Sequence, residues 1–302
     1  MTLSCQSVKS AALSIGFSDC GIAEAAPLPA GEFPLERWLQ RGYHADMGYM
    51  QRNTDKRHDP RLLLPGARSI VALLVAYKPD RQIAGAHHIA QYAYGEDYHD
   101  RLRRMMYWLI EHLKEQYPGF EARPYVDTAP ISDRHWAYRA GLGWIGKNTL
   151  LLHPRWGSYC NIGELVTTAA FDHYDKPLDE DPCCQCRRCV DACPNQALQP
   201  LDAAQRRYLL DARRCIAYNT IENREPDLPD DLDTRGYAFG CDICQAACPH
   251  NAAVAPSLHL DAQRKAQLEA LPEADEATFY ETTRHTPMSR ISYEQWQRNL
   301  RH

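Results

Sequence analysis

The chain has 302 residues, of which 44% are hydrophobic and 24% charged, and its formal net charge is −5. This composition is ordinary for a soluble globular protein, and the length allows one large domain with a smaller one. No stretch approaches the roughly 18 uninterrupted apolar residues of a membrane span. The negative net charge gives no general attraction to nucleic acid, so any RNA contact requires a local basic face.

Hydrophobic periodicity predicts a mixed α/β arrangement in the first half of the chain. The predicted helices cover residues 5–16, 34–43, 97–117 and 131–140. Residues 69–77 form a continuous apolar run bounded by prolines, which predicts a buried strand. Shorter strands are predicted at residues 125–127, 149–152 and 163–170.

A polar, acidic segment with two prolines, residues 171–182, predicts a domain boundary. Residues 176–255 then form a cysteine-rich module, and residues 256–302 return to a helical pattern. The predicted organisation is therefore a first domain at 1–175, a second at 176–255 and a C-terminal helical segment at 256–302.

Eight cysteines in the second half follow the spacing of two [4Fe–4S] cluster motifs. The first run is Cys183-x2-Cys186-x2-Cys189-x3-Cys193-Pro194, and the second is Cys241-x2-Cys244-x3-Cys248-Pro249. In bacterial ferredoxins three closely spaced thiolates hold one cluster, and the cysteine before proline crosses to the other. The second run lacks its first member, and the isolated Cys215 fills the gap. One cluster is thus predicted on Cys183, Cys186, Cys189 and Cys248, and the other on Cys193, Cys215, Cys241 and Cys244.

Disulfide and zinc interpretations of these cysteines fit less well. Disulfide frameworks are typical of short secreted chains. The N-terminus from Met1 to Cys5 shows no start of a signal peptide. Together with the predicted thiolate-bound clusters, this predicts a cytoplasmic location. A Cys-x3-Cys-Pro crossing is not a zinc-ribbon spacing. Cys184 adjoins the first ligand and competes with Cys183 for that role, although Cys183 gives the better spacing.

The segment from Tyr125 to Thr149 concentrates the other unusual chemistry. Asp127 is predicted at the end of a strand, where burial would raise the pKa of its carboxyl group and suit it to donate a proton. On spacing alone, Asp127 or Thr128 is more commonly the cap of the following helix. Three glycines between Gly141 and Gly146 permit close approach of the backbone to a large ligand.

These residues carry a family resemblance. The segments involved are Tyr125-Val126-Asp127-Thr128-Ala129-Pro130, residues 141–151, Gly163-Glu164-Leu165, residues 56–61, Tyr94-Gly95-x-Asp97-Tyr98-His99, and both cysteine runs with residues 211–222. Together they closely resemble epoxyqueuosine reductase over nearly the whole chain. The resemblance implies an α+β protein with a cobalamin-binding mixed α/β domain, similar to reductive dehalogenases, followed by a bacterial ferredoxin-like two-cluster module.

The resemblance also implies a function and a set of site residues. The family uses cobalamin and two [4Fe–4S] clusters to reduce the epoxide of epoxyqueuosine to queuosine in transfer RNA, here a tRNA with a GUN-type anticodon. The resemblance makes Asp127 the proton donor. It also implies that cobalamin is contacted by Arg57, by Asn148 and by the backbone of Ile162. We expect a monomer with no membrane partner, while the sequence does not identify the electron donor.

This chain departs from the family pattern in three places. Cys184 replaces the usual glycine after the first ligand, and Cys160-Asn161 stands where aromatic residues are common. No C-terminal helical repeats follow. The basic face for RNA is therefore expected from eight arginines: Arg187, Arg188, Arg213, Arg214, Arg284, Arg290, Arg298 and Arg301.

Two other functions remain open from the sequence. One is a reductive-dehalogenase-like cobalamin enzyme that acts on a small molecule, although such enzymes usually carry an export signal and a tyrosine acid, neither of which we identify here. The other is an electron-transfer iron–sulfur protein, in which Asp127 would have no catalytic role.

Overall fold

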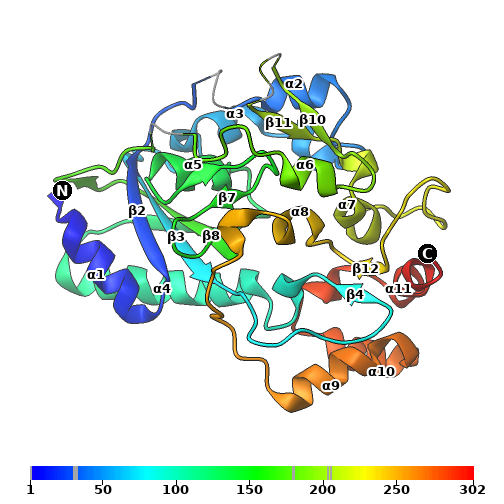
Figure 1. The fold of residues 1–302 in the computed structure, drawn as a ribbon. Coiled ribbons are helices and arrows are strands. Elements are labelled where there is room, and N and C mark those ends of the chain that lie inside the picture. Colours follow the sequence, from blue (N-terminus) through cyan, green and yellow to red (C-terminus); the bar gives the residue numbers. More distant parts are fainter. Residues whose placement is uncertain (1, 30–32, 179–180, 203, 205) are drawn as a thin grey trace.

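The computed structural model describes residues 2–29, 33–178, 181–202, 204 and 206–302. Its centre is a four-stranded antiparallel sheet in the order β2-β3-β8-β5 (Figure 1). These strands are β2 (Asp19–Glu24), β3 (Ser69–Ala76), β8 (Cys160–Thr167) and β5 (Ala122–Tyr125). All eight residues of β3 are buried, which confirms the buried strand predicted from the apolar run.

Helices cover both faces of this sheet. On one face, α1 (Cys5–Ile15) and α4 (Tyr98–Gln116) pack against Val71, Leu73 and Val75 of β3. On the other face, α5 (Asp133–Arg139) packs against the alternate residues of the same strand, in a core that includes Trp136. Because β3 is covered on both sides, its sequence is apolar throughout instead of alternating.

The predicted helices are present, with bounds set by their caps. Helix α1 ends at Gly16, which has the left-handed φ of 110° typical of a C-cap. Helix α4 begins after Asp97, whose carboxylate accepts the backbone N–H of His99. The helix predicted at 34–43 is shorter, α2 (Leu35–Gln40), and α3 (Thr54–His58) follows it.

Two predicted strands have different bounds. The strand expected at 125–127 is β5 and ends at Tyr125, because Asp127 has a φ of 45° that is incompatible with extended backbone. The strand expected at 149–152 is only β7 (Leu151–Leu152), which pairs with β6 (Trp144–Ile145) in a short hairpin.

The cysteine-rich region is built from short elements. Helices α6 (Arg188–Ala192) and α8 (Ile243–Ala246) carry ligand cysteines and pack against each other. Between them lie the hairpin β10 (Leu198–Pro200) with β11 (Tyr208–Leu210), helix α7 (Ile216–Ile221) and strand β12 (Tyr237–Phe239). Strand β12 pairs in parallel with β4 (His88–Ile89), which ties this region to the first half of the chain. Strand β1 (Thr2–Leu3) pairs likewise with β9 (Ala170–Phe171).

The C-terminal helices do not form a core of their own. These are α9 (Ala262–Ala270), α10 (Glu276–Thr283) and α11 (Tyr293–Leu300). Their buried Phe279 and Trp296 belong to a cluster that also contains Ile89 and Phe239. The three regions predicted from the sequence therefore share a core, and their division into domains stays a prediction. In the ranges given above, no helix is both long and apolar enough to cross a membrane.

Candidate active site and cluster pockets

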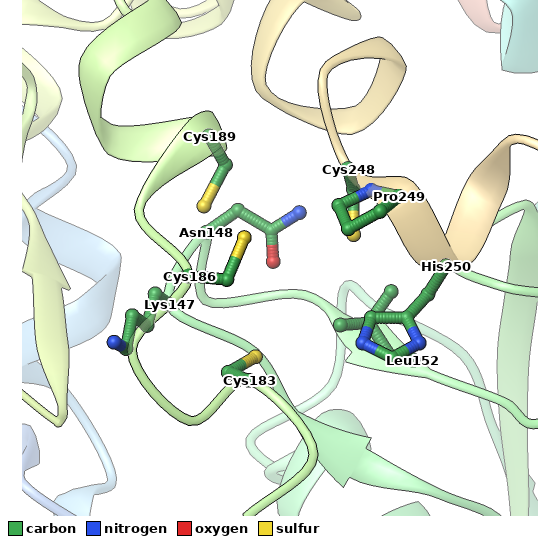
Figure 2. A pocket seen from close by; sticks show the side chains of 9 residues that line it. All are labelled: Lys147, Asn148, Leu152, Cys183, Cys186, Cys189, Cys248, Pro249 and His250. Carbon is green, nitrogen blue, oxygen red and sulfur yellow. The ribbon is translucent and has the colours of Figure 1, made fainter.

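The four cysteines predicted to hold the first cluster surround one pocket. Cys183, Cys186, Cys189 and Cys248 line it together with Lys147, Asn148 and His250 (Figure 2). Cys248 comes from the turn after α8, whereas the other three come from the first run. Cys248 lies at least 59 residues after the other three in the sequence. It joins them because the cysteine before Pro249 crosses between the runs, as the ferredoxin pattern requires.

The other four cysteines form a second group. The Cys215 thiol interacts electrostatically with Cys193, and Cys241 with both of these. Burial raises the pKa of the Cys244 thiol well above its usual range, and the neighbouring Cys241, Cys215, Cys189 and Cys193 add to the effect. The Cys189 interaction joins the two groups, so both predicted clusters lie side by side. All twelve cysteines of the chain are free thiols here, as cluster ligation requires.

The geometry favours Cys183 over Cys184 as the predicted ligand. Cys183 is buried and lines the first pocket, whereas the side chain of Cys184 is exposed and its Sγ contacts the carbonyl oxygen of Asp181 at 3.1 Å. Cys184 has a φ of 43°, in the left-handed region that favours glycine. This conformation gives a physical reason for a glycine at the equivalent position of the family.

Asp127 lies in a network of hydrogen bonds between the loop after β5 and the N-terminus of α4. Its Oδ2 accepts hydrogen bonds from the hydroxyl of Tyr98 at 2.7 Å and from Nε2 of His99 at 3.1 Å. The other ring nitrogen of His99, Nδ1, is 2.7 Å from Oδ1 of Asp97. Arg290, from the C-terminal segment, lies 3.7 Å from Oδ2 of Asp127. The Asp127 side chain remains 50% exposed, so a substrate can reach it.

The capping role for Asp127 is wrong. The N-cap residue of α5 is Ser132, and the Thr128 hydroxyl donates to the carbonyl oxygen of Val126. The backbone N–H of Asp127 instead donates to Oδ1 of Asp133 at 3.1 Å, which helps to hold Asp127 in its left-handed conformation.

The expected rise in the pKa of Asp127 is also wrong. Burial does favour a higher pKa, but the hydrogen bonds from His99 and Tyr98, and the charges of His99 and Arg290, outweigh it and lower the pKa. The same contacts act on His99 in the opposite sense. Burial lowers the pKa of His99, but its bonds to Asp127 and Asp97 raise it to about 9. At neutral pH the proton of this trio therefore resides on His99, between two carboxylates.

Sequence reasoning gave no role to Asp97, Tyr98 or His99, although all three belong to a segment of the family resemblance. The available signal was a cluster of ionisable side chains at the N-terminus of a predicted amphipathic helix. Their contact with Asp127 was not visible, because it depends on how α4 crosses the sheet. Tyr98 also places a phenol hydroxyl beside Asp127.

Two of the three predicted cobalamin contacts lie near Asp127. Arg57 is buried under the loop after Asp127, where its Nη1 is 3.4 Å from the carbonyl oxygen of Ile131. Its Nε is buried without a hydrogen-bond partner in the part of the chain that the structure describes. Ile162 packs against the same hydrophobic core as Ala129 of the Asp127 loop. Asn148, by contrast, lines the first cysteine pocket.

The glycines between Gly141 and Gly146 do not form an open cradle, contrary to our expectation. A Cβ on Gly143 would lie 2.1 Å from the carbonyl oxygen of Leu152, and one on Gly141 would lie 2.9 Å from that of Lys176. The chain itself occupies the space that we assigned to a ligand. Gly143 and Gly146 instead permit the tight packing of the β6–β7 hairpin, and Gly141 permits the close approach of Lys176.

Two of the eight arginines predicted to form a basic face have other roles in the structure. Arg298 is 2% exposed, and its guanidinium donates to the carbonyl oxygens of Asn219, Asn223 and Glu225, so it stabilises the fold. Arg290 pairs with Glu222 at 2.9 Å as well as facing Asp127, which places it in the site. The other six arginines of that set are exposed.

Comparison with known proteins agrees with this architecture. Residues 57–128 match the family model described as "Epoxyqueuosine reductase QueG, DUF1730", and residues 182–251 match the "4Fe-4S double cluster binding domain". An epoxyqueuosine reductase of Cyclobacterium marinum is 41% identical over 98% of this chain and 95% of its own length.

Solved structures show the same fold. An epoxyqueuosine reductase from Streptococcus thermophilus superimposes with a TM-score of 0.85 at 29% identity, over 98% of this chain and 79% of that one. An epoxyqueuosine reductase solved with an epoxyqueuosine-modified tRNA-Tyr stem loop has a TM-score of 0.81 at 30% identity, with the same coverage. These matches confirm the predicted fold class and the two-cluster module. The chain belongs to the epoxyqueuosine reductase family.

Proposed function

We propose that this chain reduces the epoxide of epoxyqueuosine in transfer RNA to the alkene of queuosine, with cobalamin and two [4Fe–4S] clusters as cofactors. The overall change consumes two electrons and two protons and releases the epoxide oxygen as water. The observation that carries this proposal is the hydrogen-bonded trio Asp97–His99–Asp127, which holds a proton beside an accessible carboxylate.

The residues around Asp127 fit this role. His99 is 8% exposed and stays protonated because a carboxylate faces each ring nitrogen. The Asp127 side chain is half exposed whereas His99 is buried, so a proton passed from Nε2 of His99 to Oδ2 of Asp127 would be available to the epoxide oxygen. The Tyr98 hydroxyl and Arg290 fix the orientation of the carboxylate. General acid catalysis of this kind typically contributes about 10²–10⁴-fold to the rate.

The chain also fits the two kinds of cofactor. The eight thiols lie in two adjacent groups of four, which is the donor set of two cubane clusters. The unpartnered Nε of Arg57 and the backbone of Ile162, both close to the Asp127 loop, would contact cobalamin. Bound cobalamin supplies the strongly reducing cobalt chemistry that no side chain provides.

Transfer RNA is the proposed substrate because a relative was solved with an epoxyqueuosine-modified tRNA stem loop. The exposed arginines Arg187, Arg188, Arg213, Arg214, Arg284 and Arg301 would supply positive charge for its backbone. The GUN-type anticodon, the monomeric state and the cytoplasmic location stay predictions, and the electron donor is unassigned.

The test is conversion of an epoxyqueuosine-containing tRNA stem loop by the reconstituted protein with a chemical reductant, followed by nucleoside analysis. We expect queuosine from the wild type and a loss of about 10²–10⁴-fold in Asp127→Asn. Asp100→Asn, on the exposed side of α4 where Asp100 pairs with Arg103, is the matched control and should stay active. Queuosine formation undiminished in Asp127→Asn would remove Asp127 from the mechanism. A wild type that keeps clusters but makes no queuosine would favour an electron-transfer protein.

A further inference from the structure

We propose that Lys147 and Asn148 set the reduction potential of the first cluster, Asn148 by donating a hydrogen bond to its sulfur atoms and Lys147 as a buried cation beside it. Both residues line the pocket enclosed by Cys183, Cys186, Cys189 and Cys248 (Figure 2). Neither residue belongs to the region that supplies the ligands. They are presented to it by the loop between β6 and β7.

The orientation of the Asn148 amide is fixed by the chain. Its Oδ1 accepts the backbone N–H of Leu150 at 3.3 Å, so its Nδ2 is the end left to face the pocket. Asn148 is 3% exposed, and Nδ2 has no hydrogen-bond partner among the residues that the structure describes. A buried amide N–H without a partner destabilises the fold, and a cluster sulfur that accepts this hydrogen bond would remove that cost.

Gly146 shows that the chain makes room for this amide. A Cβ on Gly146 would lie 2.8 Å from Oδ1 of Asn148 and 2.6 Å from Cδ1 of Leu152. The loop is closed by hydrogen bonds from Gly146 N–H to Leu150 and from Thr149 N–H to Gly146, each 2.9 Å. The backbone of residues 146–150 thus holds Asn148 in one position.

Lys147 brings charge to the same pocket. It is 3% exposed, and its Nζ donates a 2.7 Å hydrogen bond to the carbonyl oxygen of Cys184 and not to a carboxylate. Its charge is therefore not neutralised by this contact. A cation and an N–H donor both favour the more negative, reduced form of a cluster, so they raise its potential.

The proposal therefore predicts that the two clusters differ in reduction potential, because only the first has these two residues beside it. Removing either group should favour the oxidised form of the first cluster by about tenfold, the size expected for one charge-assisted hydrogen bond. For a one-electron couple, a tenfold change equals 59 mV. The second cluster lies beyond the pocket and serves as an internal reference in the same sample.

The experiment is a potentiometric titration of the full chain with both clusters loaded, followed by electron paramagnetic resonance, with and without cobalamin. We compare Asn148→Leu and Lys147→Met, which keep size but remove the donor or the charge. Lys114→Met, which removes an exposed lysine on α4, is the control for net charge. We expect the first cluster to become about tenfold harder to reduce in both variants, with the second cluster and the control unchanged.

Asn148→Asp covers the case in which Asn148→Leu loses iron, because it keeps the size and polarity of the side chain but replaces the donor with a negative charge. It should lower the potential further than Asn148→Leu. Unchanged potentials in variants with full iron content would overturn the proposal, as would an equal shift of both clusters. A shift that appears only with cobalamin bound would assign Asn148 to cobalamin instead.

Discussion

Replacing His99 with glutamine should change the pH dependence of epoxide reduction more than any other property. The pKa of His99 is raised to about 9 by its contacts with Asp97 and Asp127, so the trio carries its proton throughout the neutral range. In His99→Gln the proton must be carried by Asp127 alone, whose ordinary pKa is about 4. At pH 7.5 an ordinary aspartic acid is protonated in roughly one molecule in 4 × 10³. Once the histidine charge is gone, burial raises the protonated fraction of Asp127 somewhat. We therefore expect the rate of epoxide reduction to fall by about 10²–10³-fold at pH 7.5.

The direction in which activity changes with pH distinguishes loss of the proton from general damage to the site. A raised pKa keeps wild-type activity constant up to about pH 9, above which it falls as the trio loses its proton. In His99→Gln the fall should begin at a much lower pH than in the wild type, and activity should recover as the pH is lowered toward the ordinary pKa of an aspartic acid. The measurement is single-turnover conversion of the modified stem loop between pH 5 and 10. His112→Gln, in which the replaced histidine contacts Gln116 on the exposed side of the same helix, is the control. A His99→Gln profile that parallels the wild type would refute the role of His99.

Three further substitutions test other features. Cys215→Ser should remove one cluster and leave the other, so that iron falls from about eight atoms per chain to about four; unchanged iron would exclude Cys215 as a ligand. Cys184→Gly should keep both clusters and raise stability by about 0.5–1 kcal/mol, measured by anaerobic thermal unfolding, because it relieves a left-handed φ of 43°; loss of iron would contradict this. Gly143→Ala should destabilise the chain by on the order of 3 kcal/mol, because its Cβ would meet the Leu152 carbonyl at 2.1 Å, whereas Gly48→Ala has open space and should be nearly neutral. Equal stability of these two glycine variants would rule out the clash.

The cysteine groups and the main strand were predictable because each depends on local pattern. The spacing of the ligands and the proline after Cys193 and Cys248 are visible in sequence, and so is an apolar run such as β3. The surroundings of Asp127 were not predictable in the same way. Its partners come from α4, from Asp133 and from Arg290 near the end of the chain, and only the packed fold brings them together.

The glycine-rich segment failed as a predictor for a related reason. Glycine indicates that something approaches the backbone closely, but it does not say whether a ligand or the chain itself does so. At Gly143 the neighbour is the chain's own Leu152. The prediction that Arg298 belongs to the basic face was wrong for a similar reason. A charged residue near a terminus is usually solvated, but Arg298 is buried against three carbonyl oxygens.

The position of Arg290 has a consequence for synthesis on the ribosome. The sheet and the loop of Asp127 are complete once about half the chain has emerged, and the cysteine runs follow. The contact of Arg290 with Asp127, and the bonds of Asn299 to Thr220 and Ala238, require the last turns of the polypeptide. The nascent chain can therefore expose its thiols to iron–sulfur carriers before its acid site is closed. Premature termination before Arg290 would release a protein that has all its predicted metal ligands but lacks the contact of Arg290 with Asp127.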